Sequence, residues 1–228
     1  MGVIMYDFPG VREHLLPYTY VRPVGEIRIG ILTIVEKWEK FFGHPIGYHI
    51  SNPVLAAKFG DTVPFSGDLL INGALCPDPS VYQAISNLQP GEALYSKDQI
   101  IACRLAESGN YDHSRQLKTV YYEQDICLLQ RPWDIFLHNG QQIRSDFKLV
   151  TAGRQSAGIS DPHTIIYGSE NVFVEPGATV RAAVINATDG PVYLDKNSTV
   201  HEGCLIKGPF VLGKFSQLNM GAKMKGDN

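Results

Sequence analysis

Apolar side chains recur at every sixth position near the C-terminal end of the chain. A helix repeats every 3.6 residues and a strand every two, so a period of six fits neither. It is typical of the hexapeptide parallel β-helix, in which three short strands make one coil and each supplies one inward apolar residue. We therefore predict such a β-helix over residues 163–228, with an ordinary β-sandwich of accidental spacing as the alternative. The inward positions are Leu194, Val200, Ile206, Leu212, Leu218 and Met224, and Val174 and Val180 begin the same count.

The turns and the end of this repeat lead to further expectations. Gly203 and Gly221 each lie three residues after an inward position, where a corner favours a φ-permissive residue. The count shifts frame over residues 186–191, which predicts a loop there. The repeat runs to Met224, close to the last residue, and the open end of a coil needs a cover. We expect either a natural form with further coils, of which this chain is a truncated part, or an oligomer, with a trimer favoured.

The first 150 residues show a different pattern, in which strand-like and helix-like segments alternate. This alternation predicts an α/β domain over residues 1–152, with the domain boundary within residues 151–162. The helix over 132–149 has a possible break at Asn139–Gly140. The expected strands are 3–8, 45–50, 68–74, 92–105 (a hairpin) and 120–129, and the expected helices are 29–42, 80–88 and 132–149.

Composition narrows the classes of function. The 228 residues include 20 basic and 23 acidic side chains, so neither sign of charge indicates a nucleic acid or an acidic membrane as partner. No apolar run reaches the roughly 18 residues that cross a bilayer, and the N-terminus does not have a signal-peptide pattern. The four cysteines form no CxxC pair, which favours reduced thiols. We therefore expect a cytoplasmic protein with neither a nucleic acid nor a membrane as partner.

A glycine-containing loop follows the first predicted strand. Its residues Pro9, Gly10, Val11 and Arg12 precede a predicted helix, and the backbone N–H groups of such a loop can hold a phosphate. Arg12, Arg22 and Arg28 would add positive charge. A surface turn with scattered arginines is the alternative.

This strand and loop, followed by the L-x-P-x-T-x-x-x-P run of Leu15 to Pro23, resemble the sugar-phosphate nucleotidyltransferases. The resemblance is greatest to a short, divergent branch similar to the bifunctional N-acetylglucosamine-1-phosphate uridyltransferase/glucosamine-1-phosphate acetyltransferases, and it covers most of the chain. The segments that support it are RPVGEIRIGILTIVEKWE, LLINGALCPDP, RPWDIF and NATDGPVYLDKNSTVHEGCLIKGPF.

The resemblance implies a nucleotidyltransferase-like, Rossmann-like α/β domain followed by a left-handed β-helix. It implies an enzyme that joins a nucleoside triphosphate and a sugar 1-phosphate, releases pyrophosphate, and makes a nucleotide sugar such as UDP-N-acetylglucosamine for the cell envelope. Catalysis would use Arg12 and Arg22. Nucleotide binding would use Gly10, Arg12, Thr19, Asn72 and Gly73.

The family's Mg²⁺ site is altered in this sequence. A Gly-Asp pair supplies the family's metal carboxylate, and the matching pair here is Gly73–Ala74. Asp78 is the nearest substitute, and Asn139 lies in a context similar to that of the family's second ligand, although a helix-terminating turn is an equal interpretation of Asn139. The family's phosphate-facing lysine is replaced by Val24.

These departures leave alternatives open. The chain is either an active enzyme with a rearranged site, or a catalytically impaired nucleotide-sugar-binding or scaffold module trimerised by its β-helix. It could also be the N-terminal part of a bifunctional acetyltransferase. In this chain we expect no acetyl transfer, because the family's acetyltransferase residues lie in later coils. The histidine in the repeat, His201, follows inward Val200 and should face solvent.

Overall fold

The computed structural model describes residues 2–50, 52–107 and 117–227. The chain forms two compact units, one made of Met1–Arg28 with Leu32–Asp134 and the other of Ile29–Ile31 with Ile135–Asn228. Each unit has its own core and is described by itself. No helix in the described part of the chain is long and apolar enough to cross a membrane.

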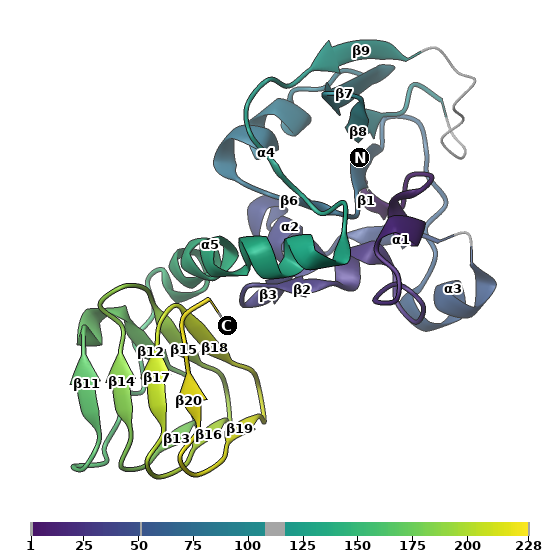
Figure 1. The fold of residues 1–228 in the computed structure, drawn as a ribbon. Helices are drawn as coiled ribbons and strands as arrows, with labels where there is room; N and C mark the ends of the chain where they lie inside the picture. Colours follow the sequence, from purple (N-terminus) through teal and green to yellow (C-terminus); the bar gives the residue numbers. More distant parts are fainter. Residues whose placement is uncertain (1, 51, 108–116, 228) are drawn as a thin grey trace. The chain divides into compact units, whose positions relative to one another are not determined.

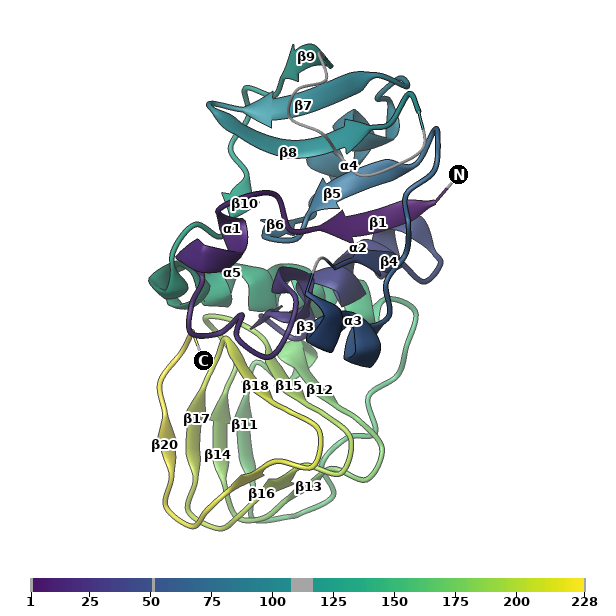
Figure 2. The same cartoon turned by 90° about the vertical axis from the view of Figure 1, so that its right-hand side faces the viewer.

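A six-stranded mixed sheet forms the centre of the first unit (Figures 1 and 2). Strand β1 lies inside the sheet and pairs in parallel with β4 on one side and with β5 on the other. Because β1, β4 and β5 are parallel, their carboxyl ends lie at the same edge of the sheet. The order is β4 (Gly47–His49), β1 (Val3–Tyr6), β5 (Leu69–Asn72), β8 (Gln99–Arg104), β7 (Glu92–Ser96) and β9 (Lys118–Tyr121).

The helices of this unit begin and end where local side chains dictate. Helix α2 (Ile34–Phe42) starts with a capping box, in which Thr33 and Glu36 each bond the other's backbone N–H, and it ends at left-handed Gly43. The predicted helix over 29–42 was therefore too long at its start, where residues Arg28–Ile29 and Leu32–Thr33 form the short strands β2 and β3. The remaining elements are α1 (Val11–His14), η1 (Val24–Glu26), α3 (Pro53–Phe59), β6 (Leu75–Cys76), α4 (Pro79–Ser86) and β10 (Cys127–Leu128).

Helix α5 (Pro132–Thr151) is continuous, so the predicted break at Asn139–Gly140 was wrong. An asparagine usually weakens a helix because its side chain competes for the backbone. Here the Asn139 side chain bonds elsewhere: its Oδ1 accepts from the N–H of Gly30 at 2.8 Å, and its Nδ2 donates to the carbonyl of Asp227 at 3.0 Å. Gly140 is needed for space, because a Cβ there would overlap the carboxylate of Asp227.

Three parallel sheets make up the rest of the second unit, and the chain passes from one to the next in turn (Figure 1). This arrangement is compatible with a three-sided parallel β-helix. The sheets are β11 (Ile165–Tyr167), β14 (Val184–Asn186), β17 (Leu205–Lys207) and β20 (Lys223–Met224); β12 (Val172–Val174), β15 (Val192–Leu194) and β18 (Phe210–Leu212); and β13 (Thr179–Val180), β16 (Thr199–Val200) and β19 (Gln217–Leu218), while η2 (Ser169–Asn171) precedes β12.

The six-residue period marks the core of this unit, as predicted. Leu194 and Val200 are completely buried, and Leu218 and Met224 pack partly buried against the same cluster. Gly203 and Gly221 have φ of 75° and 72°, the left-handed geometry expected at the corners. His201 is partly exposed, with 31% of its side-chain surface accessible.

One buried carboxylate joins two strands of this unit to the segment after α5. Glu175 accepts hydrogen bonds from Arg154 at 2.7 Å and from the Tyr193 hydroxyl at 2.5 Å. The Arg154 guanidinium also lies over the ring of Phe173, 5.1 Å from its centroid. A buried carboxylate is tolerated when it is paired and hydrogen-bonded in this way.

Candidate active site

The candidate site lies at the carboxyl ends of β1 and β5. The chain passes from β1 to β4 on one side and then returns to β5 on the other, so the strand order reverses beside β1. Ligands of open α/β sheets bind in the crevice at such a reversal. The loop that follows β1, from Asp7 to Gly10, and the turn that follows β5, at Gly73 and Ala74, are therefore the first places to look for functional groups.

The carboxylate of Asp7 lies against Gly73. A Cβ added to Gly73 would lie 2.7 Å from Oδ1 of Asp7, which is closer than any side chain tolerates. The other oxygen, Oδ2, accepts a hydrogen bond from the backbone N–H of Val24 at 3.3 Å. The glycine predicted for nucleotide binding thus makes room for a carboxylate from the neighbouring strand.

The environment of Asp7 shifts its titration. The pKa of the Asp7 carboxyl is raised to about 6, mainly because burial removes solvent from the charged form. The hydrogen bond from Val24 and the positive charge of Arg12 lower this pKa, and the negative charge of Glu13 raises it. A poorly solvated carboxylate at a strand end is the kind of group that binds a cation or exchanges a proton. Asp7 therefore stands out as a functional candidate.

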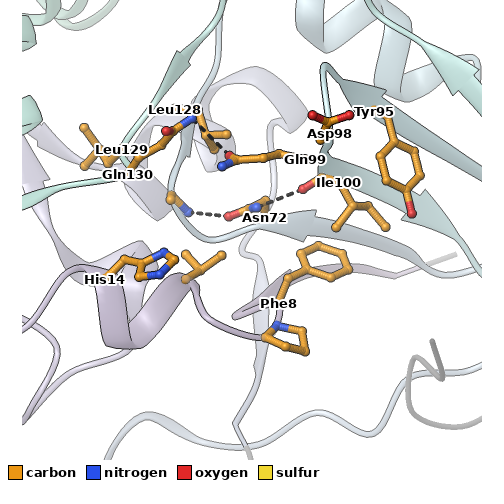
Figure 3. A pocket seen from close by; sticks show the side chains of 13 residues that line it. Phe8, His14, Asn72, Tyr95, Asp98, Gln99, Ile100, Leu128, Leu129 and Gln130 are labelled. Atoms are coloured by element: carbon orange, nitrogen blue, oxygen red, sulfur yellow. Dashed lines mark hydrogen bonds between the residues drawn. The ribbon is translucent and has the colours of Figure 1, made fainter.

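Two cavities flank the loop after β1, and both are lined by Phe8 and Pro9. The cavity on the β5 side has a volume of about 300 Å³. Figure 3 shows Phe8 and His14 on one side of it and Asn72, Gln99 and Gln130 on the other. The amide of Asn72 holds the far wall in place, because it donates to the Ile100 carbonyl at 2.9 Å and accepts from the Ala74 N–H at 3.0 Å.

The second cavity, of about 180 Å³, lies on the β4 side of the same loop. Its walls hold charges of both signs, whereas Asp98 is the acidic residue among the amides and rings that line the larger cavity. Asp7, Arg12 and Glu13 all line it, together with the ring of His49. The two cavities therefore offer different chemistry on either side of one loop.

The structure brings the residues predicted around the loop together. Gly10 adopts a left-handed φ of 83° at the start of α1. Thr19 is fully buried, and its hydroxyl donates to the carbonyl of Arg12 at 2.7 Å. The Arg12 guanidinium donates to the carbonyls of Tyr20 and Arg22 at 3.3 and 3.4 Å, so it is oriented by the loop that contains the Arg22 backbone. The Arg22 residue itself is exposed.

The two residues predicted as metal ligands have other partners in the structure. The Asp78 carboxylate caps α4, with its Oδ1 accepting from the N–H groups of Ser80 and Val81 at 2.8 and 2.9 Å. Asn139 belongs to the second unit, where its amide bonds to two backbone groups. Within residues 2–50, 52–107 and 117–227, no three His, Cys, Asp or Glu side chains are grouped to hold a metal ion.

Sequence reasoning missed Asp7, although one signal pointed to it. An acidic residue directly after a buried strand, and before a Gly-containing loop, stands where α/β sheets gather their ligands. The contact with Gly73 could not be foreseen, because it depends on which strands become neighbours.

A mixed sheet with helices and with cavities at the carboxyl ends of its parallel strands is the arrangement in which α/β proteins bind small molecules. Residues 3–155 match a protein-family model described as "Sugar nucleotidyl transferase". The chain therefore belongs to the sugar nucleotidyl transferase family, whose substrates are a nucleotide and a sugar phosphate. No curated protein matches the chain.

Proposed function

We propose that this chain transfers a nucleotidyl group from a nucleoside triphosphate to a sugar 1-phosphate, giving a nucleotide sugar and pyrophosphate. The structural observation that supports this reaction within the family is the pair of cavities on either side of the Asp7–Gly10 loop. A transfer between two substrates needs two binding sites that adjoin, so that the reacting atoms of the two substrates lie next to each other. Phe8 and Pro9, which line both cavities, mark that meeting point.

In the proposed reaction, an oxygen of the sugar 1-phosphate attacks the α-phosphorus and pyrophosphate leaves. The protein contributes mainly by positioning the phosphates and neutralising their charge. Arg12 is suited to this role, because its guanidinium lines the charged cavity and is held by two backbone carbonyls. The larger cavity, with aromatic Phe8 and Tyr95, the carboxylate of Asp98 and the amides of Gln99 and Gln130, suits a ring whose hydroxyl or amide groups can donate hydrogen bonds.

A magnesium ion is part of this proposal. Mg²⁺ sites that act on phosphates use one or two carboxylates plus the phosphates themselves, so three protein ligands are not required. The residues present fit such a site through Asp7, whose carboxylate is poorly solvated and lies beside the phosphate-facing arginine. Asp78 and Asn139 fit less well, because Asp78 uses Oδ1 to cap α4 and does not line either cavity, and Asn139 belongs to the second unit, where its Oδ1 accepts from Gly30. When bound, the ion would neutralise phosphate charge.

The finer assignments rest on the sequence resemblance. They are UDP-N-acetylglucosamine as product, a place in cell-envelope synthesis in the cytoplasm, kinship with the bifunctional acetyltransferase branch, and a trimer built on a left-handed β-helix. The three parallel sheets of the second unit support the trimer only in offering flat faces that can pack together.

One observation favours a second candidate, a nucleotide-sugar-binding or scaffold module without catalysis. Ala74 occupies the position of the family's metal carboxylate, and its side chain is a buried methyl group that cannot bind a metal ion. If Asp7 does not replace that carboxylate, the site would bind substrates and leave them unchanged.

Pyrophosphate release tests the proposal. Purified protein is incubated with Mg²⁺ and pairs drawn from a panel of nucleoside triphosphates and sugar 1-phosphates. We expect release with at least one pair, and a loss of at least about 100-fold for Arg12→Ala, since removing one transition-state charge contact costs about that much. Arg181→Ala, an exposed arginine of the second unit, is the matched control. Folded protein that binds a nucleotide but releases no pyrophosphate with any pair would favour the binding module.

A further inference from the structure

Cys76 and Cys127 lie directly opposite one another in a two-stranded antiparallel ribbon. Cys76 of β6 is the register partner of Cys127 of β10, and neither cysteine is part of a disulfide in the structure. Side chains of opposed residues point to the same face, with Cβ atoms about 4.5–5.5 Å apart. A disulfide needs a Cβ separation of about 3.5–4.5 Å, so a small closure of the ribbon would suffice to form one.

The two thiols differ in ways that suit successive steps of an exchange reaction. Cys76 is buried, whereas Cys127 is partly exposed. A hydrogen bond from Cys76 lowers the pKa of Cys127 against the effect of burial, and the nearby ammonium of Lys37 lowers it further, while the carboxylates of Asp134 and Asp78 act in the opposite direction. A partly exposed cysteine opposite a second cysteine, with a pKa below its usual value, is the usual form of a redox-sensitive pair.

Cys103 and Cys204 provide an internal comparison. Both are buried in the cores of their units, and burial raises the pKa of the Cys103 thiol to about 12. Neither should react readily with a reagent in solution. Cys76 and Cys127 thus lie opposite each other, whereas Cys103 and Cys204 are single buried thiols in separate units.

The paired cysteines are also close to the cavity on the β5 side, which is part of the proposed substrate site. Leu75 separates Cys76 from Ala74, which lines the cavity of about 300 Å³, and Leu128 and Leu129 after Cys127 line the same cavity. The Leu129 N–H donates to the Ala74 carbonyl at 3.0 Å, so a backbone hydrogen bond joins the two segments at this wall. A covalent bond between the strands would draw in both sides of the wall.

We propose that Cys76 and Cys127 form a reversible disulfide by exchange with a small-molecule disulfide, and that this bond reshapes the adjacent cavity and lowers its activity. The Cys127 thiolate attacks one sulfur of the small disulfide, forms a mixed disulfide and releases one small thiolate. The Cys76 sulfur, having lost its proton, then attacks the Cys127 sulfur and releases the second small thiolate. Two protein thiols are oxidised and one small disulfide is reduced to two thiols. Only the effect on activity depends on the proposed function.

The experiment is a titration of the folded, full chain with oxidised and reduced glutathione, followed by acid quenching, alkylation and peptide mass mapping. We expect a peptide that links Cys76 to Cys127, and its loss on return to reduced glutathione. Under reducing conditions, Cys127 should react with iodoacetamide at least about tenfold faster than Cys103 or Cys204. Cys76→Ser should instead accumulate a mixed disulfide on Cys127, and Cys204→Ala should behave as the unchanged chain.

Each outcome of the mapping decides the proposal, and none requires transferase activity. A mixed disulfide on Cys127 that persists while Cys76 is present, or a bond that involves Cys103 or Cys204, would overturn the pairing. If the linked peptide forms but pyrophosphate release by the oxidised protein equals that of the reduced protein, the link to the cavity is wrong. An inactive chain that still forms the bond shows that the proposed function has failed and the disulfide has not.

Discussion

The carboxylate of Asp7 fills the space that a side chain at Gly73 would need, with 2.7 Å between Oδ1 of Asp7 and a Cβ built on Gly73. The two residues are 66 positions apart, and they meet because β1 and β5 are parallel neighbours. The contact places a carboxylate next to Ala74, the position at which the sequence shows none. Four predictions follow from this contact and from the contacts that hold the loop and the second unit.

Gly73→Ala should displace the Asp7 carboxylate. The added methyl would also approach the Cβ of Val24 at 3.1 Å, so we expect a loss of about 1–3 kcal/mol of stability from overpacking. Pyrophosphate release should fall more than this loss of folded protein explains. Chemical denaturation and activity are measured together, with Gly213→Ala as the control because the nearest atom to a Cβ there lies at 3.5 Å. A stable variant with full activity would show that the position of Asp7 does not matter.

Asp7→Asn should stabilise the protein at neutral pH while impairing its activity. The folded-state pKa of Asp7 is raised from 3.8 to about 6, so the folded state binds more protons than the unfolded state between these values. The favourable effect of this group on stability is therefore complete below about pH 4 and is lost as pH rises through about 6.

Asparagine has no such titration, so the stability of Asp7→Asn relative to the unchanged chain should rise across about pH 4 to 6. The gain should reach about 1–3 kcal/mol above pH 7, from about 1.4 kcal/mol per pKa unit. Urea denaturation at a series of pH values measures it. If the stability gain of Asp7→Asn over the unchanged chain does not change with pH, the carboxylate at this position is not desolvated.

Thr19→Val should loosen the loop that holds Arg12. The buried Thr19 hydroxyl is a hydrogen-bond donor to the Arg12 carbonyl, and its removal should cost about 1–2 kcal/mol of stability. Since the same loop orients the Arg12 guanidinium, KM for the nucleotide should rise. Steady-state kinetics compare it with Thr19→Ser, which keeps the hydroxyl and should retain most of the activity. If Thr19→Val and Thr19→Ser have the same KM for the nucleotide, the Thr19 hydroxyl does not position Arg12.

Arg154→Ala should destabilise the second unit by about 1–2 kcal/mol, because it leaves the buried Glu175 with one fewer partner and Arg154 itself is partly solvated. Burial alone would raise the pKa of Glu175, but the hydrogen bonds of Tyr193 and Arg154 outweigh it and lower the pKa. The stabilising effect of this network is therefore present above the unfolded pKa, near 4.5, and is lost as pH falls below it. Thermal unfolding from pH 3 to 7 measures the difference between Arg154→Ala and the unchanged chain, which should shrink in acid. A difference that grows in acid would contradict the assignment.

Local patterns in the sequence determined the parts of the fold that depend on near neighbours. The six-residue period identified the buried positions from Leu194 to Leu212, because each coil repeats the same inward direction. The end of the predicted helix 29–42 was correct, because the next residue, Gly43, adopts the left-handed conformation that ends α2. The break expected at Asn139–Gly140 was wrong, because partners from distant segments occupy the Asn139 side chain and leave the helix intact.

Only the tertiary structure decided which polar groups meet. Whether Asp7 lies against Gly73, or Cys76 opposite Cys127, depends on strand order and register, and these result from packing over the whole core. The role of Asp78 is a local one by contrast, because its carboxylate bonds the first backbone N–H groups of the helix that directly follows it. The chain pattern thus determined the elements and the inward positions, whereas the candidate site arises where strands that are distant in sequence end side by side.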